Sequence, residues 1–149
     1  MSAFATCLQL VRATAEVRRR FDAGLSIHGL SLSDYTILRI LADAPAGQLR
    51  RVDVAERLGM TPSGATRLLA PLEARGLAVR LQHPSDARAS LSALTDEGRH
   101  LVEDATTTAE EVADRFVEAR LASAEIVSLS ELLVQIGRAS CRDSVLRIV

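Results

Sequence analysis

The chain has 149 residues, enough for one ordinary domain or for a small binding module joined to a helical dimerisation element. Apolar residues make up 48% of it and aromatic residues 3%, so Leu, Val, Ala and Ile must fill the interior, which favours helices. No apolar run reaches the roughly 18 residues of a membrane span. The first residues do not resemble a signal peptide, so we expect a cytoplasmic protein without a membrane partner.

The positive charges are concentrated in the middle of the chain. All 18 residues counted as Lys or Arg are Arg, and the formal net charge is −1. Residues 48–100 carry eight Arg against six acidic residues, whereas residues 101–149 carry five Arg against nine. Codon bias in a GC-rich genome is the simpler explanation for the absence of Lys. Arg is nevertheless the better bidentate partner for phosphate and guanine, so the middle segment is a candidate nucleic-acid contact.

Two helices are predicted before residue 44. Apolar residues at helical spacing predict a first helix that runs toward Phe21 and loosens over residues 24–29. Ser31 or Ser33 is expected to cap a second helix, which ends before the Pro- and Gly-containing turn at residues 44–47. The side chains that the second helix should bury are those of Ile37, Leu38 and Leu41.

Two further helices follow, with a tight turn between them. A short helix over residues 49–58 should end at Gly59, with Val54, Ala55 and Leu58 packed inward. Thr61 followed by Pro62 supplies an N-cap hydroxyl and a proline at the first helical position, so the next helix begins there and ends at Gly76. Its apolar stripe is Ala65, Leu68, Leu69 and Leu72, and its opposite face shows Ser63, Thr66 and Arg67.

A hairpin and two long helices complete the predicted elements. Alternation predicts a half-buried strand that places Leu77, Val79 and Leu81 inward, a turn at residues 83–86 and a returning strand over residues 88–94. Thr95 caps a long helix whose narrow seam is expected to pair with a second chain: Leu101, Ala105, Ala109, Val112 and Phe116. Ser123 is expected to cap a last helix that buries Ile126, Leu129, Leu132 and Leu133 in a helical cluster around a two-fold axis.

The two short helices and their turn have the pattern of a helix-turn-helix. Ser63 and Thr66 can bond phosphates or base edges, and Arg67 can form a bidentate contact with guanine. An ordinary antiparallel helix pair with a solvated polar face would show the same pattern. The hairpin that follows favours DNA binding, because Arg88 beside its turn can enter the minor groove.

These segments resemble a known family of regulators. The runs 49–67 and 72–77 look like the core of the multiple-antibiotic-resistance regulators, the MarR family. Asp86-Ala87-Arg88 is similar to the Asp-x-Arg signature of that family's wing, and residues 94–98 resemble the Leu-Thr-x-x-Gly that follows it. The resemblance implies a mainly α fold with a small β-wing, a winged helix-turn-helix flanked by N- and C-terminal dimerisation helices.

The resemblance also implies a domain layout and a function. Residues 1–30 and 99–149 would hold the dimerisation helices, and residues 31–98 the DNA-binding domain. The expected protein is a homodimeric repressor of a pseudo-palindromic operator on double-stranded DNA, released by a small aromatic or phenolic effector, with Asp86 orienting the wing. Ser90 and Ser92 replace branched apolar residues that are common in the family, which predicts a short or mobile returning strand. The candidate DNA-binding residues are Arg50, Thr61, Ser63, Thr66, Arg67, Arg75, His83, Asp86 and Arg88.

The sequence also offers effector and redox candidates. Arg18, His28 and Tyr35 are placed near the expected effector crevice without a diagnostic spacing. Cys7 has a position similar to the peroxide-sensing cysteine of one branch of the family, so a thiol-responsive repressor is an alternative. In that branch tyrosines bond the thiolate, but their places here are taken by Val11 and Phe21, so we expect a buried structural cysteine.

Other function classes have less support. No paired carboxylates, phosphate-binding loop or nucleophile triad indicates an enzyme, and neither a metal site nor a cofactor is expected. A winged-helix module that binds only proteins should show apolar anchors on the helix after Thr61, where this chain shows polar ones. Residues 136–142 resemble a translated sequencing adapter, so residues 136–149 could be non-native and Cys141 is given no role.

Overall fold

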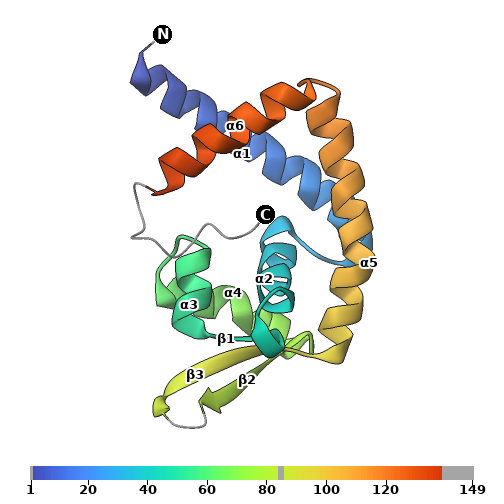
Figure 1. The fold of residues 1–149 in the computed structure, drawn as a ribbon. Helices are drawn as coiled ribbons and strands as arrows, with labels where there is room; N and C mark the ends of the chain where they lie inside the picture. Colours follow the sequence, from blue (N-terminus) through green and yellow to red (C-terminus); the bar gives the residue numbers. More distant parts are fainter. Residues whose placement is uncertain (1, 84–85, 139–149) are drawn as a thin grey trace.

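The computed structural model describes residues 2–83 and 86–138. Figure 1 shows helices α1 (Ala3–Leu25) and α6 (Ser123–Arg138) at one end of the molecule, and the strands β2 (Ala78–His83) and β3 (Asp86–Leu94) at the other. Helix α5 (Asp96–Ala113) runs along one side and connects the two ends. This mainly helical chain with a small sheet confirms the predicted fold class.

Three helices lie between the two ends, and the first of them begins where a local capping rule places it. Helix α2 (Leu32–Ala42) starts after Ser31, whose hydroxyl accepts a hydrogen bond from the Asp34 N–H at 3.1 Å, while the Asp34 carboxylate accepts one from the Ser31 N–H at 3.0 Å. Of the two predicted caps, Ser31 is therefore the cap. Helices α3 (Arg51–Arg57) and α4 (Pro62–Ala74) follow along the chain.

The core lies where α2, α4 and α5 meet. The predicted side chains of α2 are buried, and the stripe of α4 faces them, because Ala65, Leu69 and Leu72 have no exposed surface. Leu58 and Leu68, at the edges of their helices, are only partly buried. Periodicity therefore predicted the inward faces of these helices correctly. The largest side chains enclosed in this core are those of Leu25, Ile37, Leu38, Leu41, Val54, Leu69 and Leu72.

The sheet has a strand that the sequence did not reveal. After a short 3₁₀ turn, η2 (Pro45–Gly47), strand β1 (Gln48–Arg50) pairs antiparallel with β3, in the order β1-β3-β2. Gln48 is opposite Ala93 and Arg50 is opposite Leu91. The predicted helix over residues 49–58 was therefore wrong at its start, because the partner strand lies far along the chain and leaves no local signal.

The outer face of the wing carries apolar side chains. Leu77 is buried as predicted, but Val79 and Leu81 are 41% and 40% exposed and Ala78 is buried, so the predicted inward face was wrong within β2. The strand projects beyond the core, and alternation does not distinguish a face packed on the core from one left open. The returning strand β3 is nine residues long rather than short. Its Ser92 has no exposed surface, and its hydroxyl has no hydrogen-bond partner within the described residues.

Helix α5 packs within its own chain. Ala105 is fully buried and Ala109 is 6% exposed, and α5 contacts α1 and α2, so the seam is part of the protomer core at these positions rather than a pairing surface. Helix α1 continues through Gly24 instead of loosening there. A Cβ atom at Gly24 would lie 2.5 Å from Cγ2 of Val112, so the missing side chain lets the two helices approach closely. The 3₁₀ turn η1 (Ser26–His28) follows α1.

The Leu-Thr-x-x-Gly segment joins the wing to α5. The Thr95 hydroxyl accepts a hydrogen bond from the Gly98 N–H at 3.0 Å and donates one to the Gly76 carbonyl at 2.7 Å. A Cβ at Gly98 would lie 2.0 Å from the Leu77 carbonyl oxygen, so only glycine allows this contact. These contacts hold the first turn of α5 against the residues just before β2.

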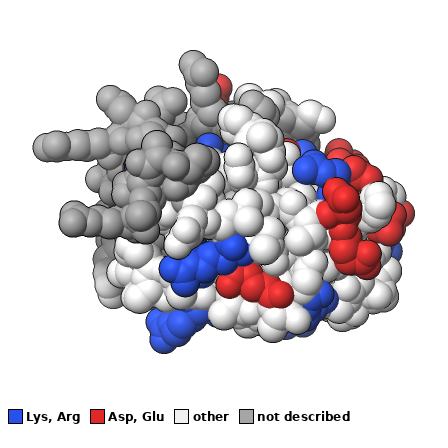
Figure 2. All heavy atoms as spheres, turned by 90° about the horizontal axis from the view of Figure 1, so that it is seen from below, with Lys and Arg blue, Asp and Glu red and all other residues white. Residues whose placement is uncertain are grey.

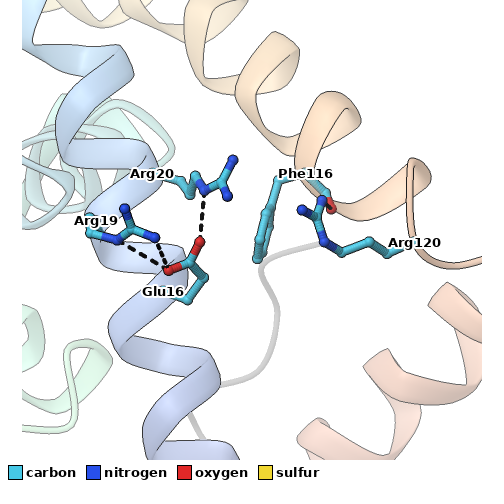
Figure 3. Close-up of polar contacts among 5 residues, drawn as sticks. All are labelled: Glu16, Arg19, Arg20, Phe116 and Arg120. Atoms are coloured by element: carbon cyan, nitrogen blue, oxygen red, sulfur yellow. Dashed lines mark hydrogen bonds and ion pairs between the residues drawn. The ribbon is translucent and has the colours of Figure 1, made fainter.

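A π-helical segment, η3 (Asp114–Glu118), connects α5 to the turn before α6. Figure 3 shows the Phe116 ring between the guanidinium groups of Arg20 and Arg120, whose Cζ atoms lie 5.5 and 4.9 Å from the ring centroid. Hydrogen bonds from Arg19 and Arg20 to Glu16 lower the pKa of that carboxyl group. These contacts connect α1 to η3 and to the turn that precedes α6.

Helix α6 leaves its apolar face uncovered within the single chain. Leu129, Leu132 and Leu133 are 41%, 55% and 45% exposed, so the predicted burial is not met by this chain alone. Ser123 is the first helical residue rather than the cap, and the Glu125 carboxylate accepts a hydrogen bond from the Ala122 N–H at 2.8 Å. None of the described helices is long and apolar enough to cross a membrane.

Candidate nucleic-acid interface

The α3–turn–α4 unit is held together by polar as well as apolar contacts. Gly59 ends α3 with φ +63°, the left-handed conformation predicted for it. The Thr61 hydroxyl accepts a hydrogen bond from the Gly64 N–H at 3.2 Å and thereby caps α4. Arg51 is buried at the start of α3 and forms an ion pair with Glu73 near the end of α4. Sequence reasoning missed this pair, because nothing local connects residues on two helices.

The hydrophilic flank of α4 faces away from the core. Ser63, Thr66 and Arg67 are all exposed, as the helical pattern predicted. Thr61 and Ser63 lie at the helix N-terminus with their hydroxyl oxygens 3.2 Å apart. Free backbone N–H groups and the helix dipole at such an end favour phosphate. We call these four residues, Thr61, Ser63, Thr66 and Arg67, the reading face.

A hollow lies beside the reading face. Its volume is about 510 Å³, it is open to solvent, and its lining is mostly apolar. It extends from the turn before α4 to the second turn of that helix, so it occupies the same surface as the reading face. The lining residues are Met60, Thr61, Gly64, Arg67 and Leu68.

The remaining Arg candidates lie at different places on this domain. Arg50 precedes α3 and forms a bidentate ion pair with Asp53, at 2.9 and 2.8 Å. Arg75 caps the C-terminal end of α4, about 20 Å from its first turn at 1.5 Å per residue. Its guanidinium lies next to Gly29, near the end of η1. The structure therefore does not bring Arg75 together with the reading face.

The wing candidates are described by their backbone only. His83 pairs with Asp86 across the hairpin, and Arg88 follows on β3. The predicted turn at Pro84 and Ser85, and the side chains of residues 83–88, lie outside the described residues. Figure 2 shows that the face seen from below carries Arg groups interspersed with acidic groups and uncharged surface, not one continuous cationic patch.

The effector candidates each contact another element. The Tyr35 hydroxyl is 3.1 Å from the Thr106 hydroxyl, and His28 Nε2 is 2.8 Å from the Thr108 hydroxyl, so α2 and η1 are both connected to α5. Arg18 of α1 donates a 3.4 Å hydrogen bond to the Ser33 hydroxyl of α2. These contacts link α1 to α2, and α2 and η1 to α5.

Cys7 is exposed in the single chain and is not in a disulfide, so the expectation of a buried cysteine was wrong here. It shares one face of α1 with Phe4, Leu8 and Val11, which are 73%, 46% and 68% exposed. Within the described residues no other element covers this apolar stripe, so side chains whose helical spacing is typical of burial are exposed. Cys141 lies outside the described residues.

Comparison with known proteins identifies the family and gives the same fold. The MarR family model matches residues 28–89. An HTH-type transcriptional repressor of Mycobacterium tuberculosis is 30% identical over 128 residues, covering 86% of this chain and 90% of the relative.

Two solved structures extend the comparison. CouR from Rhodococcus jostii RHA1, bound to p-coumaroyl-CoA, is 30% identical with a TM-score of 0.78, covering 91% of this chain and 93% of CouR. A MarR family regulator from Streptomyces coelicolor in complex with DNA has a TM-score of 0.86 at 24% identity, covering 96% and 95% of the two chains, which shows a shared fold. With its helix-turn-helix, its wing and these relatives, the chain belongs to the MarR family of DNA-binding transcriptional regulators.

Proposed function

We propose that the protein represses transcription by binding a pseudo-palindromic operator as a homodimer, with the reading face in the major groove. The observation that carries this proposal is that α4 has one buried apolar face and one exposed polar face. Its apolar stripe, Ala65, Leu69 and Leu72, is fully buried, whereas Ser63, Thr66 and Arg67 are exposed. Ser and Thr hydroxyls would hold phosphates or base edges, and Arg67 would read guanine.

The wing would contact the neighbouring minor groove. The hairpin of β2 and β3 extends from the end of the molecule opposite to α1 and α6. In our proposal Arg88 enters the groove, Asp86 orients it, and His83 contacts the backbone nearby. Narrow AT-rich minor grooves attract Arg, so this contact would favour AT-rich flanks.

The dimer would form through the exposed apolar faces of α1 and α6. Sixteen residues of α6 form a helix whose apolar side chains are mostly exposed in the single chain. A contiguous apolar surface of this kind marks an interaction site, and an isolated helix of this length is only marginally stable in water. A second copy supplies a matching face under two-fold symmetry and would place two reading faces about one DNA turn apart.

An effector would bind between helices α1, α2 and α5. CouR binds p-coumaroyl-CoA, and by this likeness we propose a small aromatic or phenolic compound for this chain. Arg18, His28 and Tyr35 carry a cation, an imidazole and a phenol near this junction. Their contacts to Ser33, Thr106 and Thr108 are hydrogen bonds that a polar ligand could replace, which would change the angle between the domain and its helices.

The proposal is tested by binding the full chain to an operator selected from random duplexes, measured by fluorescence anisotropy across a salt series. Affinity should fall steeply with salt, since phosphate contacts release counterions. Arg67→Ala should weaken operator binding by about 1–3 kcal/mol and random-DNA binding much less. Arg115→Ala, an equal loss of charge on η3, is the matched control. Equal loss on both DNAs for Arg67→Ala would contradict the base-reading role.

A further inference from the structure

The first turn of α4 contains a glycine, Gly64, that its backbone conformation does not require. Gly64 is not among the residues with positive φ, so any residue could adopt its conformation. Glycine is disfavoured in helices relative to alanine, since it loses more conformational freedom on folding. The absence of a Cβ atom at this position therefore calls for another explanation.

The missing side chain lies next to the hollow beside the reading face. A Cβ at position 64 would lie 3.3 Å from the Thr61 hydroxyl oxygen, 3.6 Å from the Met60 sulfur and 3.8 Å from the Met60 Cβ. All three residues line the hollow. The three nearest atoms are all side-chain atoms, and the contact with Thr61 is a tight one, so alanine would crowd a part of the lining that glycine leaves clear.

The hollow is apolar on a surface where polar groups would be expected. Met60 and Leu68 are partly buried and line it, and Arg67 forms part of its edge. Among the four bases, thymine alone presents an apolar group in the major groove, its 5-methyl group. An apolar recess beside a guanidinium therefore matches a thymine close to the base that the guanidinium reads.

We propose that this hollow receives the 5-methyl group of one thymine in each operator half-site, and that Gly64 is a specificity-determining residue because it has no side chain. The inference rests on the proposed function, since it requires the reading face to enter the major groove. It predicts that a guanine read by Arg67 has a thymine within the same few base pairs, and that the preference at the thymine depends on position 64.

The first arm of the test changes only the DNA. Each thymine of the selected operator is replaced by deoxyuridine, which lacks just the methyl group, at symmetric positions of both half-sites. Burial of one methyl group predicts a loss of roughly fourfold in affinity per half-site, or about 15-fold for both. One symmetric pair of thymines should show this loss in anisotropy titrations, and the other thymines should not.

The second arm changes the protein. In Gly64→Ala, thymine and deoxyuridine at the sensitive position should bind with nearly equal affinity, because the added methyl takes the place in the hollow that the thymine methyl would occupy. Ala74→Gly is the matched control, since it changes the helix propensity of α4 at an exposed position outside the hollow, and it should keep the full deoxyuridine penalty. Met60→Ala removes one wall and should reduce the penalty as well. Thermal unfolding shows whether each variant is folded.

The outcomes separate this inference from the proposed function. If no thymine is sensitive, or if the penalty persists in Gly64→Ala and Met60→Ala, the methyl recess is wrong even when Arg67→Ala still loses its preference for the operator. If the full chain selects no sequence at all, the proposed function itself fails. The inference is supported if the loss of affinity caused by deoxyuridine shrinks in Gly64→Ala and Met60→Ala and stays in full in Ala74→Gly.

Discussion

The DNA-binding domain and the terminal helices differ in how far they bury their apolar residues. In the domain, α2 and α4 enclose Leu38 and Leu69 completely. At the other end, α1 and α6 expose Phe4 and Leu132 at 73% and 55%. The same helical periodicity therefore has two outcomes. The domain buries its apolar stripes within one chain, whereas the apolar faces of the terminal helices stay exposed in it.

The largest effect is expected where a second copy would sit. Leu133→Glu places a charge in the proposed dimer face of α6, where each buried Leu contributes about 1.5–3 kcal/mol and the symmetric interface contains it twice. Dimer association should weaken by about 3–6 kcal/mol, measured by sedimentation equilibrium. Gln135→Glu adds the same charge on α6 away from the stripe and should leave association unchanged. An undisturbed dimer in Leu133→Glu would mean that another surface mediates pairing.

A core substitution in the domain should act differently. Leu69→Ala removes a fully buried side chain and should lower the free energy of unfolding by about 2–5 kcal/mol in urea titrations. Association of the folded chains should not change, because Leu69 lies inside one protomer. Leu132→Ala, on exposed α6 surface, should show the reverse pattern. Similar behaviour of the two variants would remove the distinction between the two regions.

The buried ion pair sharpens the comparison within the domain. Glu73→Ala leaves Arg51 buried without its carboxylate and should cost about 1.5–3 kcal/mol of unfolding free energy. Asp43→Ala breaks the exposed pair with Arg39 and should cost at most about 1 kcal/mol. A double-mutant cycle with Arg51→Ala isolates the coupling. No coupling between Arg51 and Glu73 would show that α3 and α4 are held by apolar packing alone.

The smallest effect is expected at the sheet. Ser92→Ala removes a fully buried hydroxyl that has no partner within the described residues, so it should stabilise the fold by up to about 1 kcal/mol. Ser90→Ala, at a partly buried position on the same strand, should change little. Differential scanning calorimetry measures both. A loss of stability in Ser92→Ala would indicate that the hydroxyl is hydrogen bonded in solution.

Much of the candidate site follows from short stretches of sequence. The capping hydroxyl of Thr61, the left-handed Gly59 and the apolar stripe ending at Leu72 involve neighbours within one or two helical turns. Those rules are local, so the orientation of Ser63 and Arg67 could be predicted. The exposed flank of α4 is the direct consequence of its buried stripe.

Most errors in the prediction involve distant partners, whereas the start of α6 at Ser123 is a local error. Strand β1 exists because Leu49 pairs with Ser92. Val79 is exposed because its strand extends past the core, and Ala105 is buried because α5 packs on α1 and α2. Cys7 is exposed because no described residue covers its face of α1. None of these relations leaves a periodic signal near the residue concerned.

The amino-acid sequence by itself determined the helical segments, the caps at Ser31, Thr61 and Thr95 and the polar face of α4, because hydrogen bonds and side-chain periodicity operate over a few residues. Only the tertiary structure decided which apolar faces are internal and which remain open, how Arg51 meets Glu73, and that Gly64 borders a hollow. Those properties depend on which segments approach in space, and burial is a property of the assembled chain rather than of any one segment.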